Sequence, residues 1–120
     1  MATIKSFTDI SQSRKLSEIL PLESADMYYG YGKDKPEFLP YSDVEIKKLC
    51  LSCWSLAALL EILDKSAYSV NEAGIVELLS VKATKGVIIL NCGKIEDCYA
   101  DNPIDACVAM IEKLYELKLL

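Results

Sequence analysis

The sequence predicts a single α+β domain in which an antiparallel sheet of three or four strands packs against two or more helices. Two observations support this prediction. The stretch from Asp101 to Leu120 has the pattern of a capped amphipathic helix, and residues 68–100 are rich in β-branched residues separated by short glycine-containing segments. With 120 residues, of which 52 % are hydrophobic, the chain is long enough for one compact core. We therefore expect one domain over residues 1–120, with helices first, the sheet second and a helix last.

The first element expected is a helix that ends at Leu20. Thr8 or Asp9 suits its N-cap position, because a short polar side chain there accepts a hydrogen bond from a free backbone N–H. Pro21 ends the helix, since proline has no N–H to donate. The apolar residues are Ile10, Leu16, Ile19 and Leu20, and the polar ones are Ser13, Arg14, Lys15 and Glu18. This pattern predicts a helix that is buried on its apolar side only.

Residues 22–41 are expected to contain little regular structure. One or two helical turns through Met27 precede Gly30 and Gly32, which break them. The range from about 30 to 41 contains two Gly, two Pro and charges of both signs. These residues are typical of turns, so the sequence predicts a Gly/Pro/Tyr-rich surface loop over this range.

Two helices are expected next. Ser42 and Glu45 form a capping box, so the first of these helices begins at Asp43. The run from Trp54 to Leu63 is apolar on all sides, which predicts a second, buried helix that ends over residues 64–66. Whether residues 43–64 form one helix or two depends on the linker at 51–53; two helices are favoured, with Ser52 or Ser55 as the cap of the second.

From Tyr68 onward the apolar residues follow the period of strands. Tyr68 and Val70 alternate with polar residues, and the β-rich runs 75–83, 86–90 and 95–100 follow. The segment 84–86 is a suitable hairpin connection, which predicts an antiparallel meander. A competing interpretation makes residues 71–80 helical, because Glu72, Ala73 and Leu78 tolerate a helix.

The last helix has the clearest start signals in the chain. Asn102 is a good N-cap, Pro103 suits the first helical position, and Asp105 places negative charge near the positive end of the helix dipole. The apolar positions of this helix are Ile104, Cys107, Val108, Ile111, Leu114 and Tyr115. Their helical spacing predicts one core-facing side. Across both buried helices we expect burial of Leu56, Leu59, Leu60, Val108, Ile111 and Leu114.

Charge and hydropathy exclude several classes of partner. The net charge is -5, and basic residues cluster only at 33–35 and 47–48, whereas nucleic-acid binding depends on a concentrated basic surface. No apolar run approaches the roughly 18 to 20 residues that a membrane-spanning helix needs. The first fifteen residues are interrupted by Lys5, Asp9 and Arg14, so they do not resemble a secretory signal. We therefore expect a cytoplasmic protein that binds neither nucleic acid nor a membrane.

The chain contains no histidine. It therefore lacks the side chain most used for proton transfer near neutral pH, the base of Ser-His and Cys-His pairs, and the commonest transition-metal ligand. This absence favours a non-enzymatic role without a cofactor.

Cys50 and Cys53 form a C-x-x-C motif, a spacing that allows a redox pair or half of a metal site. A zinc site would need two further ligands from Cys92, Cys98 and Cys107, and the separation of Cys92 from Cys98 does not match common zinc knuckles. Five cysteines are an odd number, and free cysteines are often buried as small apolar residues. The sequence favours buried, reduced thiols, with a redox or metal site at Cys50 and Cys53 as the alternative.

An acidic group surrounds the start of the last helix. Its members are Glu96, Asp97, Asp101 and Asp105. Carboxylates gathered in this way can bind Mg²⁺ or Ca²⁺, but their spacing matches no cation-binding loop. Helix capping and solvation explain Asp101 and Asp105 without a cation.

Five aromatic rings are concentrated around the predicted loop. They are Tyr28, Tyr29, Tyr31, Phe38 and Tyr41. Such amphipathic rings are favoured in protein-recognition surfaces, so this region is the expected partner-binding site. The alternative is that the rings pack inward. Because a small domain has much surface for its volume, we also expect self-association or a protein partner to cover these rings or the C-terminal segment 117–120.

Three blocks of the chain carry a resemblance to a known family: ESADMYY at 23–29, CWSLAALLEIL at 53–63 and ADNPIDACVAMIEKL at 100–114. Together they resemble a family of small uncharacterised proteins from prophages and integrated mobile elements of anaerobic gut bacteria. The resemblance implies a cytoplasmic accessory protein that acts through a partner. In that family the positions of Cys50 and Cys53 are not dependably cysteine, which weighs against a functional C-x-x-C.

Overall fold

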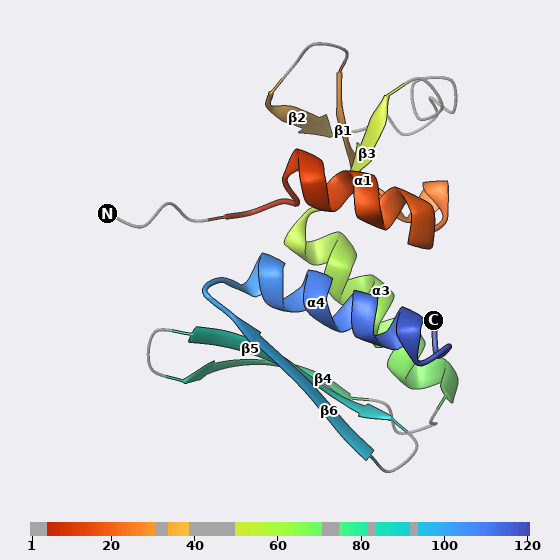
Figure 1. Ribbon diagram of the computed structural model, residues 1–120, viewed down its shortest axis with the longest axis vertical. Coiled ribbons are helices and arrows are strands. Elements are labelled where there is room, and N and C mark those ends of the chain that lie inside the picture. Colours follow the sequence, from red (N-terminus) through yellow and green to blue (C-terminus); the bar gives the residue numbers. More distant parts are fainter. Residues whose placement is uncertain (1–4, 31–33, 39–49, 71–74, 82–83, 92–93) are drawn as a thin grey trace.

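The computed structural model describes residues 5–30, 34–38, 50–70, 75–81, 84–91 and 94–120, and it confirms the α+β fold class (Figure 1). Within these ranges, three α-helices lie between two antiparallel sheets of three strands each. The larger sheet comes from the second half of the chain and the smaller sheet from the first half. The helix at the end of the chain packs on the larger sheet, as the sequence predicts.

The larger sheet is the predicted meander. Its strands are β4 (Ile75–Val81), β5 (Thr84–Asn91) and β6 (Lys94–Ala100), in the order β4-β5-β6. The prediction of a connection at 84–86 was wrong, because these residues pair with β4 and β6 inside the sheet. The competing helical interpretation is also wrong for residues 75–80. Residues 71–74 lie outside the described part of the chain.

Helix α3 (Leu56–Val70) extends past the predicted end at 64–66. The strand prediction for Tyr68–Val70 was therefore wrong: a helix that has already formed gains one hydrogen bond for each residue added, and this outweighs a short alternating pattern. Leu59 is fully buried as expected. Leu56 and Leu60 are only partly buried, and Leu60 lies on the open side of α3, beside the edge strand β4.

The start of α3 is held by residues from the preceding segment. Ser55 is its cap, since the backbone N–H of Ala58 donates to Ser55 Oγ at 3.2 Å. Asp26 accepts from the Ser55 backbone N–H at 2.9 Å and from its hydroxyl. The Trp54 indole N–H donates to Ser24 Oγ at 3.0 Å. The segments 23–29 and 53–63 therefore contact each other.

Helix α4 (Pro103–Glu116) begins as predicted, with Asn102 Oδ1 accepting from the Asp105 backbone N–H at 2.9 Å. Its core residues include the predicted Ile104, Cys107, Val108, Ile111 and Leu114, and also Ala106 and Met110. The extra burial arises because α4 contacts the sheet on one side and α3 and α1 on others. Tyr115 is 52 % exposed, contrary to expectation, because it lies beside polar residues of α1.

Helix α1 (Ile10–Ile19) begins at the predicted cap, Asp9, which forms a capping box with Gln12, and it ends one residue before the predicted Leu20. Leu16 and Leu20 are buried in the main core. Ser13 is fully buried as well, which the amphipathic pattern did not predict. It lies on a second buried side of α1, which contacts the smaller sheet.

The smaller sheet was not predicted. Its strands are β1 (Met27–Tyr29), β2 (Pro36–Phe38) and β3 (Leu51–Cys53), in the order β2-β1-β3. The helical prediction before Met27 holds only for one 3-10 turn, η1 (Leu22–Ser24). The predicted loop at 30–41 contains β2, and the predicted helix linker at 51–53 is β3. The helix predicted from Asp43 lies outside the described residues.

Candidate functional site

The aromatic residues predicted to bind a partner do not form one exposed patch. Tyr29 is 5 % exposed, and its hydroxyl donates to the Thr8 carbonyl at 2.7 Å. Tyr28 is half-buried and its hydroxyl donates to Glu37 at 3.1 Å. Phe38 is 70 % exposed. Tyr31 and Tyr41 lie outside the described residues, so within the described part Phe38 alone is a strongly exposed ring of this group.

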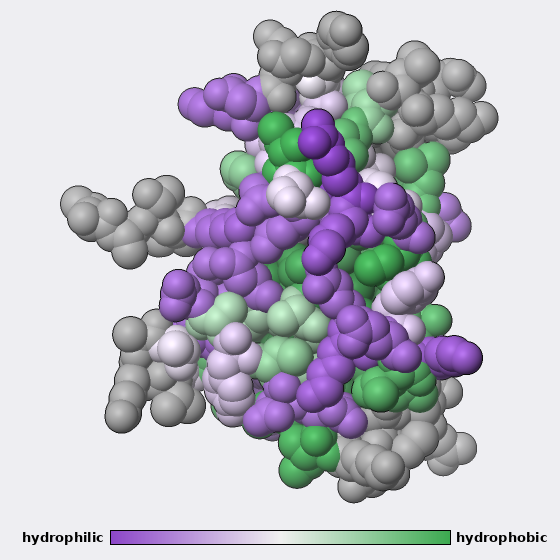
Figure 2. Space-filling view, viewed as in Figure 1, coloured by the Kyte–Doolittle hydropathy of each residue, from purple (hydrophilic) through white to green (hydrophobic). Residues whose placement is uncertain are grey.

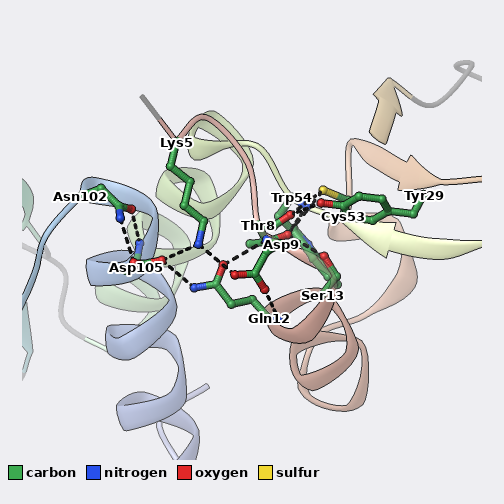
Figure 3. A network of polar contacts seen from close by, with 10 residues as sticks. All are labelled: Lys5, Thr8, Asp9, Gln12, Ser13, Tyr29, Cys53, Trp54, Asn102 and Asp105. Carbon is green, nitrogen blue, oxygen red and sulfur yellow. Dashed lines mark hydrogen bonds and ion pairs between the residues drawn. The ribbon is translucent and has the colours of Figure 1, made fainter. Parts of the chain in front are cut away.

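Cys53 belongs to a buried polar cluster beside the smaller sheet, which we call the Thr8 cluster (Figure 3). Thr8 Oγ1 lies 2.8 Å from Ser13 Oγ and accepts from the Trp54 backbone N–H at 3.1 Å. The Cys53 thiol donates to the Thr8 carbonyl at 3.4 Å. The cluster joins the N-terminal segment to α1 and β3.

The electrostatics of the Thr8 cluster oppose nucleophilic chemistry. Burial raises the pKa of the Cys53 thiol and outweighs the hydrogen bonds from neighbouring hydroxyls. Burial and the proximity of Cys53 raise the pKa of Tyr29 to about 12. A thiol attacks as the thiolate, so these shifts keep Cys53 in its unreactive form. The geometry is that of a structural anchor.

Cys50 and Cys53 do not have the helix-start geometry expected of a redox pair. Cys50 is half-buried and immediately precedes β3, and Cys53 ends that strand. The extended backbone of β3 lies between the two Cα atoms and holds them too far apart for a disulfide, which requires Cα atoms about 4.4 to 6.8 Å apart. Cys98 and Cys107 belong to the main core, away from the cluster that contains Cys53. Burial raises the pKa of Cys107 to about 12. Cys92 lies outside the described residues.

The described ranges contain no group of three or more cysteines and carboxylates arranged to hold a metal ion. The acidic group predicted from the sequence is dispersed. Glu96 forms an ion pair with Lys113 at 3.0 Å on the helix side of the larger sheet. Asp97 follows it on β6 and therefore lies on the opposite face. Asp101 is exposed, and Asp105 belongs to a separate network.

That network connects the N-terminal ends of α1 and α4 (Figure 3). Asp105 Oδ1 accepts from Lys5 Nζ and from Gln12 Nε2, each at 2.7 Å, and Asp105 Oδ2 accepts from Asn102 Nδ2 at 2.8 Å. Lys5 also pairs with Asp9 at 3.1 Å. These carboxylates and donors form hydrogen bonds at the N-terminal ends of both helices, which stabilises the two ends together.

The ionisation of this network follows from its contacts. Partial burial would raise the pKa of Asp105, but the hydrogen bonds from Lys5, Gln12 and Asn102 outweigh it and lower the pKa. Partial burial would likewise raise the pKa of Asp9, but hydrogen bonds from the Gln12 backbone and from Lys5 outweigh it and lower the pKa. Partial burial would lower the pKa of Lys5, but its hydrogen bonds to both carboxylates raise it. All three groups are therefore held in their charged forms.

A candidate binding surface lies on the larger sheet. Paired residues of an antiparallel sheet share a face, so the row Val76, Ile89 and Glu96 lies on the side covered by α3 and α4. The next row, Glu77, Ile88 and Asp97, lies on the other side, which we call the outer face. In the part of the chain that the structure describes, no helix packs on the outer face, and Figure 1 shows all three helices on the opposite side.

The outer face is more apolar than a solvated sheet face requires. Leu79 and Ile88 are half-buried on it, Tyr99 is 45 % exposed and Ile95 is 68 % exposed. Tyr99 pairs with Gly86, and a Cβ at residue 86 would lie 2.4 Å from the Tyr99 ring. The glycine therefore lets the aromatic ring lie across β5. The sequence signal for this face is the unbroken apolar run 87–90, which is typical of strands buried on both sides.

Comparison with protein-family models, curated proteins and solved structures finds no match to this chain. Among the described helices, none is long and apolar enough to cross a membrane. The surface of the space-filling view in Figure 2 mixes hydrophilic and hydrophobic areas over the helices.

Proposed function

We propose that this chain is a non-enzymatic protein-binding module whose contact surface is the outer face of the larger sheet. The observation that carries the proposal is an apolar, aromatic sheet face with no covering element among the described residues. Antiparallel sheets that face water usually present polar residues on that side, and an exposed apolar patch rimmed by charge is characteristic of an interface. The resemblance to prophage proteins supports an accessory role in the cytoplasm of a host cell.

The outer face has the composition of a binding surface. Half-buried Ile88 occupies its centre, Tyr99 and Ile95 project from β6, and Glu77 and Asp97 lie at its sides. An apolar and aromatic centre with a polar rim is the usual anatomy of protein interfaces. The outer face is a better candidate surface than the region from Tyr28 to Tyr41, because the buried Tyr29 hydroxyl already donates to the Thr8 carbonyl.

Two equally exposed apolar residues provide a direct test. Ile95 on the outer face is 68 % exposed and Phe38 on the smaller sheet is 70 % exposed, so Ile95→Arg and Phe38→Arg change similar surfaces. Tagged wild type and both variants are expressed in the native cell, captured after brief cross-linking, and compared by quantitative mass spectrometry. We expect one partner to be lost with Ile95→Arg and retained with Phe38→Arg. The reverse result would assign binding to the smaller sheet and refute the outer face.

Self-association is tested separately. In the C-terminal segment Leu119 packs against the core, while Leu117 and Leu120 are 48 % and 41 % exposed. Light scattering at micromolar concentration is expected to give the monomer mass of 13.3 kDa, because the proposal assigns the apolar face to a different protein. A dimer that Ile95→Arg dissociates would instead identify a second copy as the partner.

A further inference from the structure

We infer that the outer face binds an amphipathic α-helix of another protein, one whose apolar stripe is flanked on both sides by Lys or Arg. The inference rests on the proposed function and specifies the chemistry of the partner. It follows from where the two carboxylates lie relative to the apolar residues.

The carboxylates lie on the two outer strands, on either side of the central apolar residue. Glu77 on β4 pairs with Ile88 on β5, and Ile88 pairs with Asp97 on β6, so the three form one row across the sheet. Both carboxylates are exposed. Within the described ranges, neither one forms an ion pair or hydrogen bond with another residue. Each is therefore available to a cation supplied from outside.

The spacing of the row matches the width of a helix. Neighbouring strands are about 4.8 Å apart, so the columns of β4 and β6 are separated by roughly 10 Å. An α-helix with its side chains is about 10 to 12 Å in diameter. A helix aligned along β5 places its apolar stripe on Ile88, and basic residues on its two flanks then reach Glu77 and Asp97.

The rows on either side of Ile88 extend the apolar surface along the strands. Leu79, Gly86 and Tyr99 form the next row on the same face, and Ile95 belongs to the row on the other side. Because Gly86 has no side chain, the Tyr99 ring lies across β5 at this point, and no β5 side chain projects from the middle of this row. An α-helix with an apolar stripe can therefore contact the central strand β5 over several rows.

A second copy of this chain fits the same face poorly. A twofold axis through Ile88 and parallel to β5 would place Glu77 opposite Asp97 of the other copy, and an axis along the row would place each carboxylate opposite its own copy. Like charges that face each other across an interface are unfavourable. Lys85 does not compensate for this repulsion, because it lies on the covered side, where its Nζ donates to Ser80 Oγ at 2.9 Å.

The test uses two synthetic helical peptides of equal length with the same leucine stripe, one flanked by Lys and one by Glu. Binding to isotope-labelled protein is followed by amide shifts in NMR titrations. We expect the Lys-flanked peptide to shift residues of β4, β5 and β6, with weaker binding at higher salt. The double variant Glu77→Lys with Asp97→Lys is expected to reverse the preference, with a change of about tenfold or more for each peptide.

A matched control has the same change in net charge at a different place. Glu23→Lys with Glu116→Lys replaces two exposed carboxylates away from the outer face, and it is expected to retain the preference for the Lys-flanked peptide. The inference is overturned if neither peptide binds at millimolar concentration, if both bind equally, or if the control reverses the preference too. It is also overturned if the face pairs two copies of the chain. These failures leave intact the comparison of Ile95→Arg with Phe38→Arg, so the protein-binding proposal is judged independently.

Discussion

Replacing Asp105 with alanine is expected to lower the free energy of unfolding by about 2 to 3 kcal/mol. The substitution removes the acceptor for Lys5, Gln12 and Asn102, each within 2.8 Å. A hydrogen bond to a charged group contributes about 1.5 to 3 kcal/mol when it is buried. The Asp105 side chain is 34 % exposed, so each bond is discounted to about 1 kcal/mol for screening by water.

Urea unfolding at pH 7, followed by circular dichroism, measures this loss. Asp101→Ala is the matched control, because Asp101 is an exposed carboxylate near the same helix start, and it is expected to change stability by less than about 0.5 kcal/mol. Asp105→Asn keeps an acceptor for one donor and should fall between the two. If Asp105→Ala costs no more than Asp101→Ala, the network does not stabilise the contact between α1 and α4.

Three further predictions follow from burial and ionisation. Asp9 and Asp105 have lowered pKa values, so the stability that they contribute is present above their ordinary pKa of 3.8 and is lost as the pH falls through their lower pKa values in the folded protein. Urea unfolding of Asp105→Asn should therefore show a smaller loss of stability between roughly pH 5 and 2 than the wild type. Leu59→Ala should cost about 3 to 4 kcal/mol because Leu59 is fully buried, whereas Leu117→Ala, at an exposed position, should cost less than about 0.5 kcal/mol; equal costs would contradict the assigned core. In native protein at pH 8, Cys53 and Cys107 should react with a thiol reagent far more slowly than Cys50, as measured by mass spectrometry of the labelled sites, and rapid labelling of Cys107 would contradict its raised pKa.

The elements predicted correctly are those whose signals are local. The start of α4 depends on Asn102, Pro103 and Asp105, and these residues cap the helix whatever surrounds it. The capping box of α1 is local in the same way. The strands of the larger sheet are seven or eight residues long and pair with their nearest neighbours in sequence, so their patterns could be recognised.

The smaller sheet could not be recognised for the opposite reasons. Each of its strands has three residues, which is too short for an alternating pattern to stand out. Tyr29 pairs with Leu51 across a long intervening segment. Burial of Thr8 and Ser13 depends on non-local contacts too, because Thr8 Oγ1, which bonds to Ser13 Oγ, also accepts from the backbone N–H of Trp54 at the end of β3. No property of the isolated segments indicates that they meet.

The sequence and the structure favour different surfaces for the proposed recognition role. A concentration of tyrosines indicated a recognition surface, but the Tyr29 hydroxyl is used to satisfy the Thr8 carbonyl. The apolar run 87–90 indicated an apolar outer face, but only the arrangement of the described helices, all on the opposite side, shows that this face is uncovered by them. The pairing of Ile88 with both Glu77 and Asp97 required the strand register, which the sequence alone does not specify.

The contrast between the two sheets has a consequence for the order of folding. Contacts within the segment from β4 to α4 join residues close in sequence, which lowers the entropy lost when they form. The Thr8 cluster instead joins Thr8 to Trp54 and closes a loop of more than forty residues. The C-terminal segment should therefore assemble early and present α4 as a template, and α1 with the smaller sheet should dock onto it later. During synthesis this template leaves the ribosome after the first half of the chain. The smaller sheet is therefore supported only after the second half has been made.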